Sequence, residues 1–243
     1  MNQKTGGLNE EWDKVIDVLS QIIPVYDRVN HFISFGKDLV YRREGILKTI
    51  KSNDIVLDAG AGPGVMSQIL LQSVQDTGNL VMLDPLKVML SQARRRIVDK
   101  SIHFSLGIFE SLPFRDKSFD VVMTGFSLRD AGNLHFAVTE IHRVLKDGGS
   151  FLIVDLGKPN NRFFRWIIGI HWRYLVGLLG FIAAGRKGLL FTTLYTTYKK
   201  LLTNEEQKNL FEEIFSEVSF QTRMLGGVVI VKCKKTESNR INL

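Results

Sequence analysis

The sequence is nearly free of the residue that builds disulfide scaffolds and thiolate metal sites. Its 243 residues include one cysteine, Cys233. A single cysteine excludes an intrachain disulfide framework and any zinc or iron–sulfur centre that needs several thiolates. The five histidines do not cluster along the chain either, so we expect no metal site.

The chain also has no apolar run at its start, no internal repeat and no low-complexity segment. Residues 1–11 are polar, which argues against a cleaved secretory signal. The composition, 44% hydrophobic and 23% charged, is that of a globular protein and excludes disorder and coiled-coil repeats. The length favours one large domain over two small ones.

Positive charge is present in excess. The chain has 32 Lys and Arg against 25 Asp and Glu, a net charge of +7. Such a balance suits nucleic acid, an anionic membrane surface or an anionic ligand, and does not choose among them. The run Arg94-Arg95-Arg96 would point in three directions on a helix, and no nucleic-acid recognition motif accompanies it. We therefore expect no nucleic-acid partner.

One apolar stretch is about as long as a membrane span. Residues 163–185 read FFRWIIGIHWRYLVGLLGFIAAG. Arg165, His171 and Arg173 lie inside it, and an ionisable group at mid-bilayer costs several kcal/mol. We therefore favour an interfacial or lid-forming helical segment over a true span.

Apolar runs alternate with amphipathic segments along the chain. The patterns predict helices at about 9–23, 38–50, 65–73, 86–98, 134–145 and 205–215, and strands at 55–57, 80–83, 103–106, 119–124, 150–156, 217–224 and 228–234. Gly148-Gly149 is expected to end the fifth helix, and Gly226-Gly227 to join an antiparallel hairpin. The alternation implies parallel strands with right-handed crossovers. The predicted class is α/β: a Rossmann-like doubly wound sheet, mostly parallel with an antiparallel C-terminal hairpin and helices on both faces.

The first predicted strand runs into a glycine-rich turn, Asp58-Ala59-Gly60-Ala61-Gly62-Pro63-Gly64. In an open parallel sheet the ligand lies beyond the carboxyl ends of the strands. Glycines let the backbone approach that ligand closely, and the following helix offers free N–H groups. A strand–turn–helix corner that merely needs glycine is the alternative. Because the second strand also ends in an acid, Asp84, we favour nucleotide-type binding.

The two acids at the strand ends favour one nucleotide over another. A dinucleotide fingerprint is G-x-G-x-x-G, but Val65 stands at the third glycine position counted from Gly60. Asp58, directly before the loop, suits a ligand with an ammonium or sulfonium charge. Asp84 is placed to accept hydrogen bonds from a ribose diol. Together they favour S-adenosylmethionine over NAD, although Asp58 could instead cap backbone N–H groups and Asp84-Pro85 the next helix.

Several stretches resemble a class I S-adenosylmethionine-dependent methyltransferase: VLDAGAGPG (56–64), VMLDPLKVMLSQAR (81–94), ESLPFRDKSFDVVMTGFSLRD (110–130) and IHRVLKDGGSFLIVDLGKP (141–159). With VYDRVNHFISFG (25–36) and GGVVIVKCKK (226–235), the chain more narrowly resembles the ubiquinone/menaquinone biosynthesis C-methyltransferase family. The resemblance covers residues 25–235. It implies S-adenosylmethionine as cofactor and a cofactor site made by Asp58, Gly60, Gly62, Gly64, Asp84, Pro85, Phe109 and Ser127.

The chain departs from the family pattern at several site positions. Ile108 stands where the family has the Asp that bonds the adenine amino group, so adenine recognition leans on backbone groups and on apolar contact with Phe109. Asp130 replaces the Asn of the Leu-Arg-Asn triplet, and Asp155 replaces a Glu on the fifth strand. These departures leave the acceptor open without affecting the fold.

The resemblance places Arg129 beside the methyl-transfer site and Tyr26 in the helix that closes over the cofactor, and together with Asp130 these are the expected catalytic residues. Carbon methylation needs an electron-rich acceptor, such as a phenol or hydroquinone that has lost its proton. Arg129 cannot be the base because its pKa exceeds 12, so its expected role is to stabilise a phenolate. Asp130, through a water, is the nearest base candidate, and Tyr26 would bond the substrate or the cofactor carboxylate. The alternatives are a surface ion pair of Arg129 with Asp130 and a core tyrosine anchoring its helix.

The sequence thus predicts a C-methyltransferase that acts on a prenylated quinol. A methyltransferase for another lipophilic or small acceptor, and a non-catalytic cofactor-binding member of a membrane-associated assembly, are the rival functions. We expect cytoplasmic localisation with peripheral membrane contact through residues 163–190, and a homodimer stays open. The expected divisions are a helical cap (1–50), a cofactor-binding core (51–157), an apolar substrate lid (158–203) and a C-terminal helix with hairpin (204–235).

Overall fold

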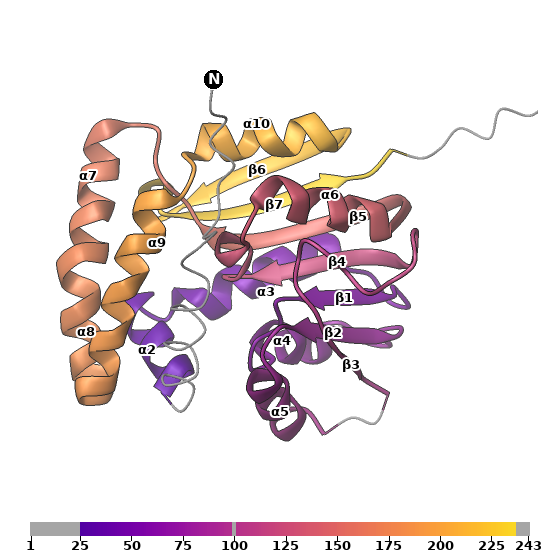
Figure 1. Cartoon of the computed structure of the whole chain (residues 1–243), viewed down its shortest axis with the longest axis horizontal. Coiled ribbons are helices and arrows are strands. Elements are labelled where there is room, and N and C mark those ends of the chain that lie inside the picture. Colours follow the sequence, from indigo (N-terminus) through magenta and orange to yellow (C-terminus); the bar gives the residue numbers. More distant parts are fainter. Residues whose placement is uncertain (1–24, 99–100, 237–243) are drawn as a thin grey trace, which may run out of the picture.

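A computed structural model describes residues 25–98 and 101–236 of the chain. The helix expected over residues 9–23 lies outside these ranges. The described residues form a seven-stranded sheet in the order β3-β2-β1-β4-β5-β7-β6 (Figure 1). Its strands are β1 (Val56–Ala59), β2 (Leu80–Asp84), β3 (His103–Leu106), β4 (Phe119–Gly125), β5 (Leu145–Leu156), β6 (Glu217–Arg223) and β7 (Val228–Lys234).

The first five strands of the sheet are parallel, and the C-terminal strands are not. β1 lies between β2 and β4, and the outer pairs β2–β3 and β4–β5 are parallel as well. β7 runs antiparallel to both β5 and β6. The carboxyl ends of β1, β2 and β4 therefore meet at one edge of the sheet. This arrangement confirms the predicted mixed sheet with an antiparallel C-terminal hairpin.

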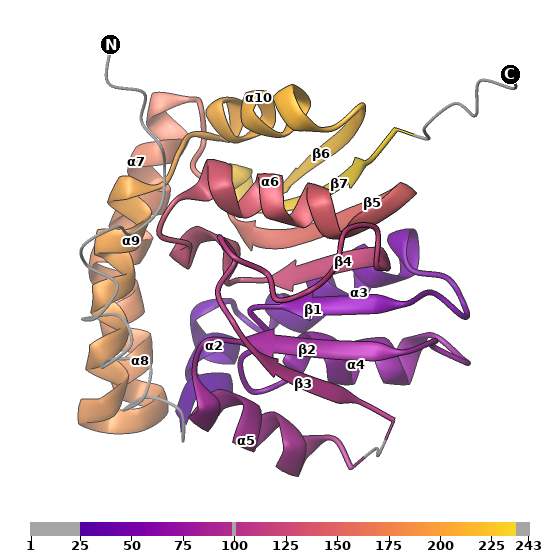
Figure 2. The ribbon, with the colours of Figure 1, turned by 45° about the vertical axis from the view of Figure 1, so that its right-hand side comes forward.

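Helices cover both faces of the sheet because the buried strand residues alternate between them (Figures 1 and 2). Leu57 and Ala59 pack with α6 (Leu134–Val144) and α10 (Asn204–Ile214). On the other face, Val56 packs with the apolar sides of three helices. These are α3 (Lys37–Thr49), α4 (Val65–Ser73) and α5 (Lys87–Arg96).

The predicted role of Gly148 and Gly149 as the end of a helix is wrong. α6 ends at Val144, and β5 begins at the next residue and runs through Gly148 and Gly149. The register shifts there: Leu145 pairs with Phe119, and Ser150 pairs with Val121. Gly148 has a φ of +72°, which a glycine adopts without strain. The glycines therefore permit a bulge inside the strand rather than end the helix.

Residues 162–200 form a helical hairpin beside the sheet (Figure 2). α7 (Arg162–Ile170), a π-helical turn (His171–Leu175, here the π-turn) and α8 (Val176–Ala184) run in one direction. The chain reverses at Gly185 (φ +58°) and returns through a 3-10 segment (Gly185–Thr193) and α9 (Leu194–Lys200). The inner side of α7 and α8 is buried against α2 (Tyr26–Ile33).

The hairpin is apolar enough to resemble a membrane-crossing segment. By length and composition alone, residues 162–200 could cross a membrane if they formed one helix. An 18-residue window within them has a mean hydropathy of 1.6, and 33% of that window is buried. The reversal at Gly185 divides the stretch into two antiparallel arms. The described structure therefore shows a folded cover that packs on the domain.

The two arms touch where Gly188 meets Gly180. A Cβ on Gly188 would overlap the carbonyl group of Gly180, whereas a Cβ on Gly169 would meet nothing within 4 Å. We expect Gly188→Ala to lower the free energy of unfolding by about 1–3 kcal/mol, as overpacking does. Gly169→Ala, the matched control in α7, should leave it unchanged or raise it by up to about 1 kcal/mol. Urea denaturation measures both, and equal stabilities would contradict this packing.

Candidate active site

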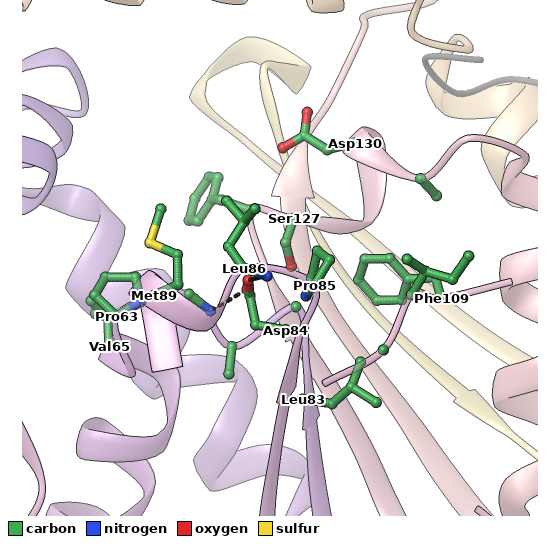
Figure 3. A pocket seen from close by; sticks show the side chains of 18 of the residues that line it. Pro63, Val65, Leu83, Asp84, Pro85, Leu86, Met89, Phe109, Ser127 and Asp130 are labelled. Carbon is green, nitrogen blue, oxygen red and sulfur yellow. Dashed lines mark hydrogen bonds between the residues drawn. The ribbon is translucent and has the colours of Figure 1, made fainter. Parts of the chain in front are cut away.

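A cavity that is open to solvent lies at the carboxyl edge of the parallel strands. We call it the cofactor cavity. The glycine loop after β1, the end of β2 and the segment after β4 form its wall, and Figure 3 shows Asp84, Phe109 and Ser127 converging on it. Five of the predicted cofactor residues besides Asp84 line it: Gly60, Gly62, Pro85, Phe109 and Ser127.

The glycine loop needs its glycines for backbone conformation and for space. Gly60, Gly62 and Gly64 have φ values of +67°, +54° and +85°, a region that other residues rarely adopt. A Cβ on Gly60 would lie 2.5 Å from the Ser127 hydroxyl and 2.7 Å from the Phe109 ring. The close approach of Phe109 and Ser127 to the loop therefore excludes any larger residue at position 60.

Asp84 holds the glycine loop from the end of β2. One carboxylate oxygen accepts the Gly62 N–H at 2.8 Å (dashed in Figure 3), and the other accepts the Leu86 N–H at 2.8 Å. Burial raises the pKa of Asp84 to about 6. At neutral pH the group is ionised and keeps lone pairs for further donors, as a ribose diol would supply.

Asp58 lies outside the wall of the cofactor cavity, as does Gly64. One oxygen of Asp58 accepts the backbone N–H of Ser67 at 3.1 Å and the Ser67 hydroxyl at 2.6 Å. Asp58 therefore caps a backbone N–H at the start of α4, the alternative role that the sequence left open. The other oxygen is buried without a hydrogen-bond partner among the described residues, and burial raises the pKa of this carboxyl to about 7. Asp58 thus leaves an unsatisfied acceptor near the loop, which fits a donor supplied by a ligand or a water.

A second cavity, also open to solvent, adjoins the first. We call it the acceptor cavity. Arg42 and Phe126 belong to the walls of both cavities. The remaining wall comes from α2, α3, the turn after β4, the end of β5, the hairpin, the turn before β7 and the start of β7. Its residues are Asn30, Ile33, Ser34, Asp38, Tyr41, Arg129, Leu156, Ile168, His171, Trp172, Met224, Gly227 and Val228.

Arg129 and Asp130 lie in a 3-10 turn after β4 (Leu128–Asp130) and face different cavities. Arg129 lines the acceptor cavity, and Asp130 lines the cofactor cavity. The Arg129 guanidinium donates to Asp155 at 2.7 Å and lies 3.8 Å from Asp130. The Arg129 side chain is only 7% exposed, so the pair is not a surface ion pair. Burial raises the pKa of Asp130 to about 6, against the opposing effect of Arg129.

Arg42, which the sequence analysis missed, connects the two cavities. Its side chain is buried, its guanidinium donates to the Gly125 carbonyl at 3.3 Å, and it lies 4.8 Å from the centre of the Phe126 ring. The charge of Arg42 also offsets part of the rise that burial causes in the pKa of Asp58. The signal in the sequence was spacing alone, because Asp38, Arg42, Gly45, Ile46 and Thr49 share the buried side of α3.

The role of Tyr26 and the expected absence of a metal site stay predictions. Tyr26 begins α2, but its side chain lies outside the described part of the chain, so its predicted role stays a prediction. Among the described residues, no three His, Cys, Asp or Glu side chains come together to hold a metal ion.

The raised pKa of Asp84 gives a pH dependence to cofactor binding. Above about pH 6 the carboxylate is ionised; it accepts the Gly62 N–H, and it would accept the hydroxyls of a bound ribose. Protonation removes acceptor capacity, so we expect the Kd for S-adenosylmethionine to rise as pH falls from 7.5 to 5. Titration calorimetry at each pH measures this. The Asp84→Asn variant should bind S-adenosylmethionine weakly, and its Kd should not change around pH 6. A wild-type Kd that stays constant over this pH range, in protein that remains folded, would contradict a role of Asp84 in cofactor binding.

Comparison with known proteins identifies relatives over most of the chain. Residues 7–235 match the ubiE/COQ5 methyltransferase family. The demethylmenaquinone methyltransferase of Leptospira interrogans is 32% identical over an alignment of 244 positions, which covers 96% of this chain and 94% of that protein. The demethylmenaquinone methyltransferase of Symbiobacterium thermophilum is 30% identical over 233 residues, 91% and 92% of the two chains.

Solved structures share the fold at lower identity. An S-adenosylmethionine-dependent methyltransferase from Thermotoga maritima superposes with a TM-score of 0.61 at 17% identity, over 90% of this chain and 99% of that one. A second, from Aquifex aeolicus, gives 0.58 at 15% identity, over 86% and 97%. They confirm the predicted Rossmann-like architecture. The family match across nearly all of the sequence, with relatives at 30% identity or more, shows that this chain belongs to the ubiE/COQ5 methyltransferase family and is an S-adenosylmethionine-dependent methyltransferase.

Proposed function

We propose that the chain methylates a ring carbon of a prenylated quinol, a demethylmenaquinol or a ubiquinone precursor, in respiratory quinone biosynthesis. The observation that carries the proposal is the pair of adjoining cavities that share Arg42 and Phe126. A donor in one cavity and an acceptor in the other would meet at these two residues. The names of the relatives from Leptospira and Symbiobacterium support a demethylmenaquinol acceptor.

The residues around the cofactor cavity fit a nucleoside with a cationic end. Asp84 offers acceptors to a ribose, and Phe109 and Ile108 give apolar contact in the part of the wall where adenine would lie. S-adenosylmethionine supplies an electrophilic methyl group on a sulfonium when bound. The chain's own contribution is to hold donor and acceptor in line and to exclude water.

Two buried guanidinium groups face the acceptor cavity. Arg42 and Arg129 both lie in its wall, and positive charge there stabilises a phenolate oxygen as it forms. Asp155 fixes Arg129 by accepting from its guanidinium at 2.7 Å and from its backbone N–H at 3.2 Å. Asp130 is a base candidate from the side of the cofactor cavity, and its raised pKa of about 6 suits proton transfer near neutral pH.

The outer side of the hairpin supports peripheral binding to a membrane. Exposed apolar residues follow each other every three or four positions along α7, the π-turn and α8, and we call this row the apolar stripe. Its members are Phe163, Trp166, Ile170, Tyr174, Leu178, Phe181 and Ile182. An exposed stripe with aromatic residues suits the interface of a bilayer, where a prenylated acceptor is dissolved.

Charge in the same segment matches an anionic membrane surface. Between Asp155 and Glu205 the sequence has eight Lys and Arg and no Asp or Glu. Since the whole chain has a net charge of +7, the positive excess is concentrated around the hairpin. We infer a cytoplasmic enzyme that docks on anionic lipid through residues 163–190.

The direct test is turnover. The protein is incubated anaerobically with S-adenosylmethionine carrying a labelled methyl group and with a short-chain demethylmenaquinol, and the products are separated and analysed by mass spectrometry. We expect label on a ring carbon. Absence of a methylated product from protein that binds the cofactor would sink the proposal.

Arg129 should matter for turnover more than for cofactor binding. Arg129→Gln alone would leave Asp155 buried without its cation, so the double variant Arg129→Gln/Asp155→Asn replaces the ion pair by neutral hydrogen-bonding groups. We expect turnover to fall by about 10²-fold or more, with the Kd for S-adenosylmethionine within about twofold. Equal losses of turnover and affinity would contradict the placement of Arg129 on the acceptor side.

Membrane docking is tested with vesicles. We expect the wild type to bind vesicles containing phosphatidylglycerol more than pure phosphatidylcholine vesicles, and less as salt screens the charges. Phe163→Ser/Phe181→Ser should weaken binding by about tenfold or more. Phe136→Ser is the matched control, since Phe136 on α6 is 61% exposed and Phe163 is 63% exposed. A wild type that stays in the aqueous fraction would refute docking.

A further inference from the structure

The acceptor cavity contains a histidine for which the proposed function has so far given no role. His171 is the first residue of the π-turn, and its side chain lines this cavity with Arg129, Arg42 and Trp172. π-helical turns are rare and often lie at functional sites. The turn joins α7 to α8, so the hairpin brings this imidazole to the acceptor side of the site.

Two aromatic rings flank the imidazole of His171. The centroids of the Phe35 and Trp172 rings lie 5.9 and 5.5 Å from the centroid of the His171 ring. A neutral imidazole has one N–H and one nitrogen lone pair. Whichever ring nitrogen carries the hydrogen, the other one keeps a lone pair that can accept a proton.

The surroundings of His171 keep it neutral at physiological pH. Burial lowers its pKa from 6.5, and the backbone of Ile33 offsets only part of that effect. The titratable groups that line the same cavity are Asp38, Tyr41 and Arg42 from α3 and Arg129 from the turn after β4. On the hairpin itself, Arg173 lies over the Tyr195 ring, and Tyr198 stacks on Trp172.

The other polar groups of the acceptor cavity are less suited to take a proton. Arginine stays protonated at any physiological pH, which removes Arg42 and Arg129 as bases. Asp38 accepts the Ser34 hydroxyl at 2.9 Å. Asp130 belongs to the wall of the cofactor cavity. His171 therefore combines a free lone pair with a place in the acceptor wall.

We propose that His171 is the general base that takes the proton of the acceptor's ring hydroxyl, an inference that rests on the proposed function. The O–H bond breaks, its electron pair stays on the acceptor oxygen, and the ring carbon becomes nucleophilic. That carbon forms the new bond to the methyl group, while sulfur keeps the electron pair of the broken C–S bond. The ring carbon then loses its own hydrogen as a proton to water, and the imidazolium returns its proton to the oxygen.

The test compares the pH dependence of wild type and His171→Gln with a short-chain demethylmenaquinol. We expect His171→Gln to lower kcat at pH 7 by about 10²-fold or more, as loss of a general base does. Its rate should then rise about tenfold per pH unit from 7 to 9, because it depends on the fraction of acceptor that is already ionised. The wild-type rate should stay nearly flat over that range. A variant profile parallel to the wild type would overturn the inference.

Controls separate a chemical role from a structural one. His135→Gln, at an exposed histidine on α6, should match the wild type. Imidazole in solution should restore part of the activity of His171→Ala, and a lack of rescue together with a parallel profile would mean that the side chain only supports the hairpin. Wild-type protein that binds cofactor but methylates no quinol would instead refute the proposed function itself.

Discussion

Parallel pairing of β1 with β2 and with β4 is the constraint on which the site depends, because it brings three strand ends to one edge of the sheet. The end of β1 supplies Gly60 and the end of β2 supplies Asp84 to the cofactor cavity. The segment after β4 supplies Ser127 to the cofactor cavity and Arg129 to the acceptor cavity. β5 pairs with β4 and adds Asp155, which holds Arg129 by two hydrogen bonds. Gly60 and Ser127, which are far apart in the sequence, therefore share one wall.

The hairpin of residues 162–200 lies at that edge of the sheet, and it has two apolar sides. Ile168, Trp172 and Val176 on the inner side are buried against Val29 and Ile33 of α2. The apolar stripe on the outer side is exposed in the described part of the chain. A helix that is apolar on all sides is stable when both sides are buried. A lipid interface would satisfy the outer side while the inner side excludes water, so closing the site and meeting a lipid-dissolved acceptor would be one property of the same segment.

Sequence reasoning reached the elements with strong local signals and missed those that depend on packing. The loop at Gly60 could be predicted because positive φ and close approach leave a residue signature in the chain. Gly148 carries the same signature, but nothing local distinguishes a bulge from a helix end. Arg42 and His171 could not be assigned, since each meets its surroundings only in the folded chain. Arg42 donates to the Gly125 carbonyl, and His171 lines one cavity with Arg42 and Arg129. Charge patterns place such residues on a solvated surface, and only tertiary structure buries them.

Burial acts in opposite directions on the acids and the histidine of this site. It raises the pKa of Asp84 and Asp130 to about 6 and lowers that of His171 from 6.5, since a dry environment disfavours the charged form of each. The carboxyl groups therefore hold a proton more readily, and the imidazole less readily, than the same groups do in water. Because His171 lies in the hairpin that packs against α2, the lowered pKa of its imidazole depends on that packing.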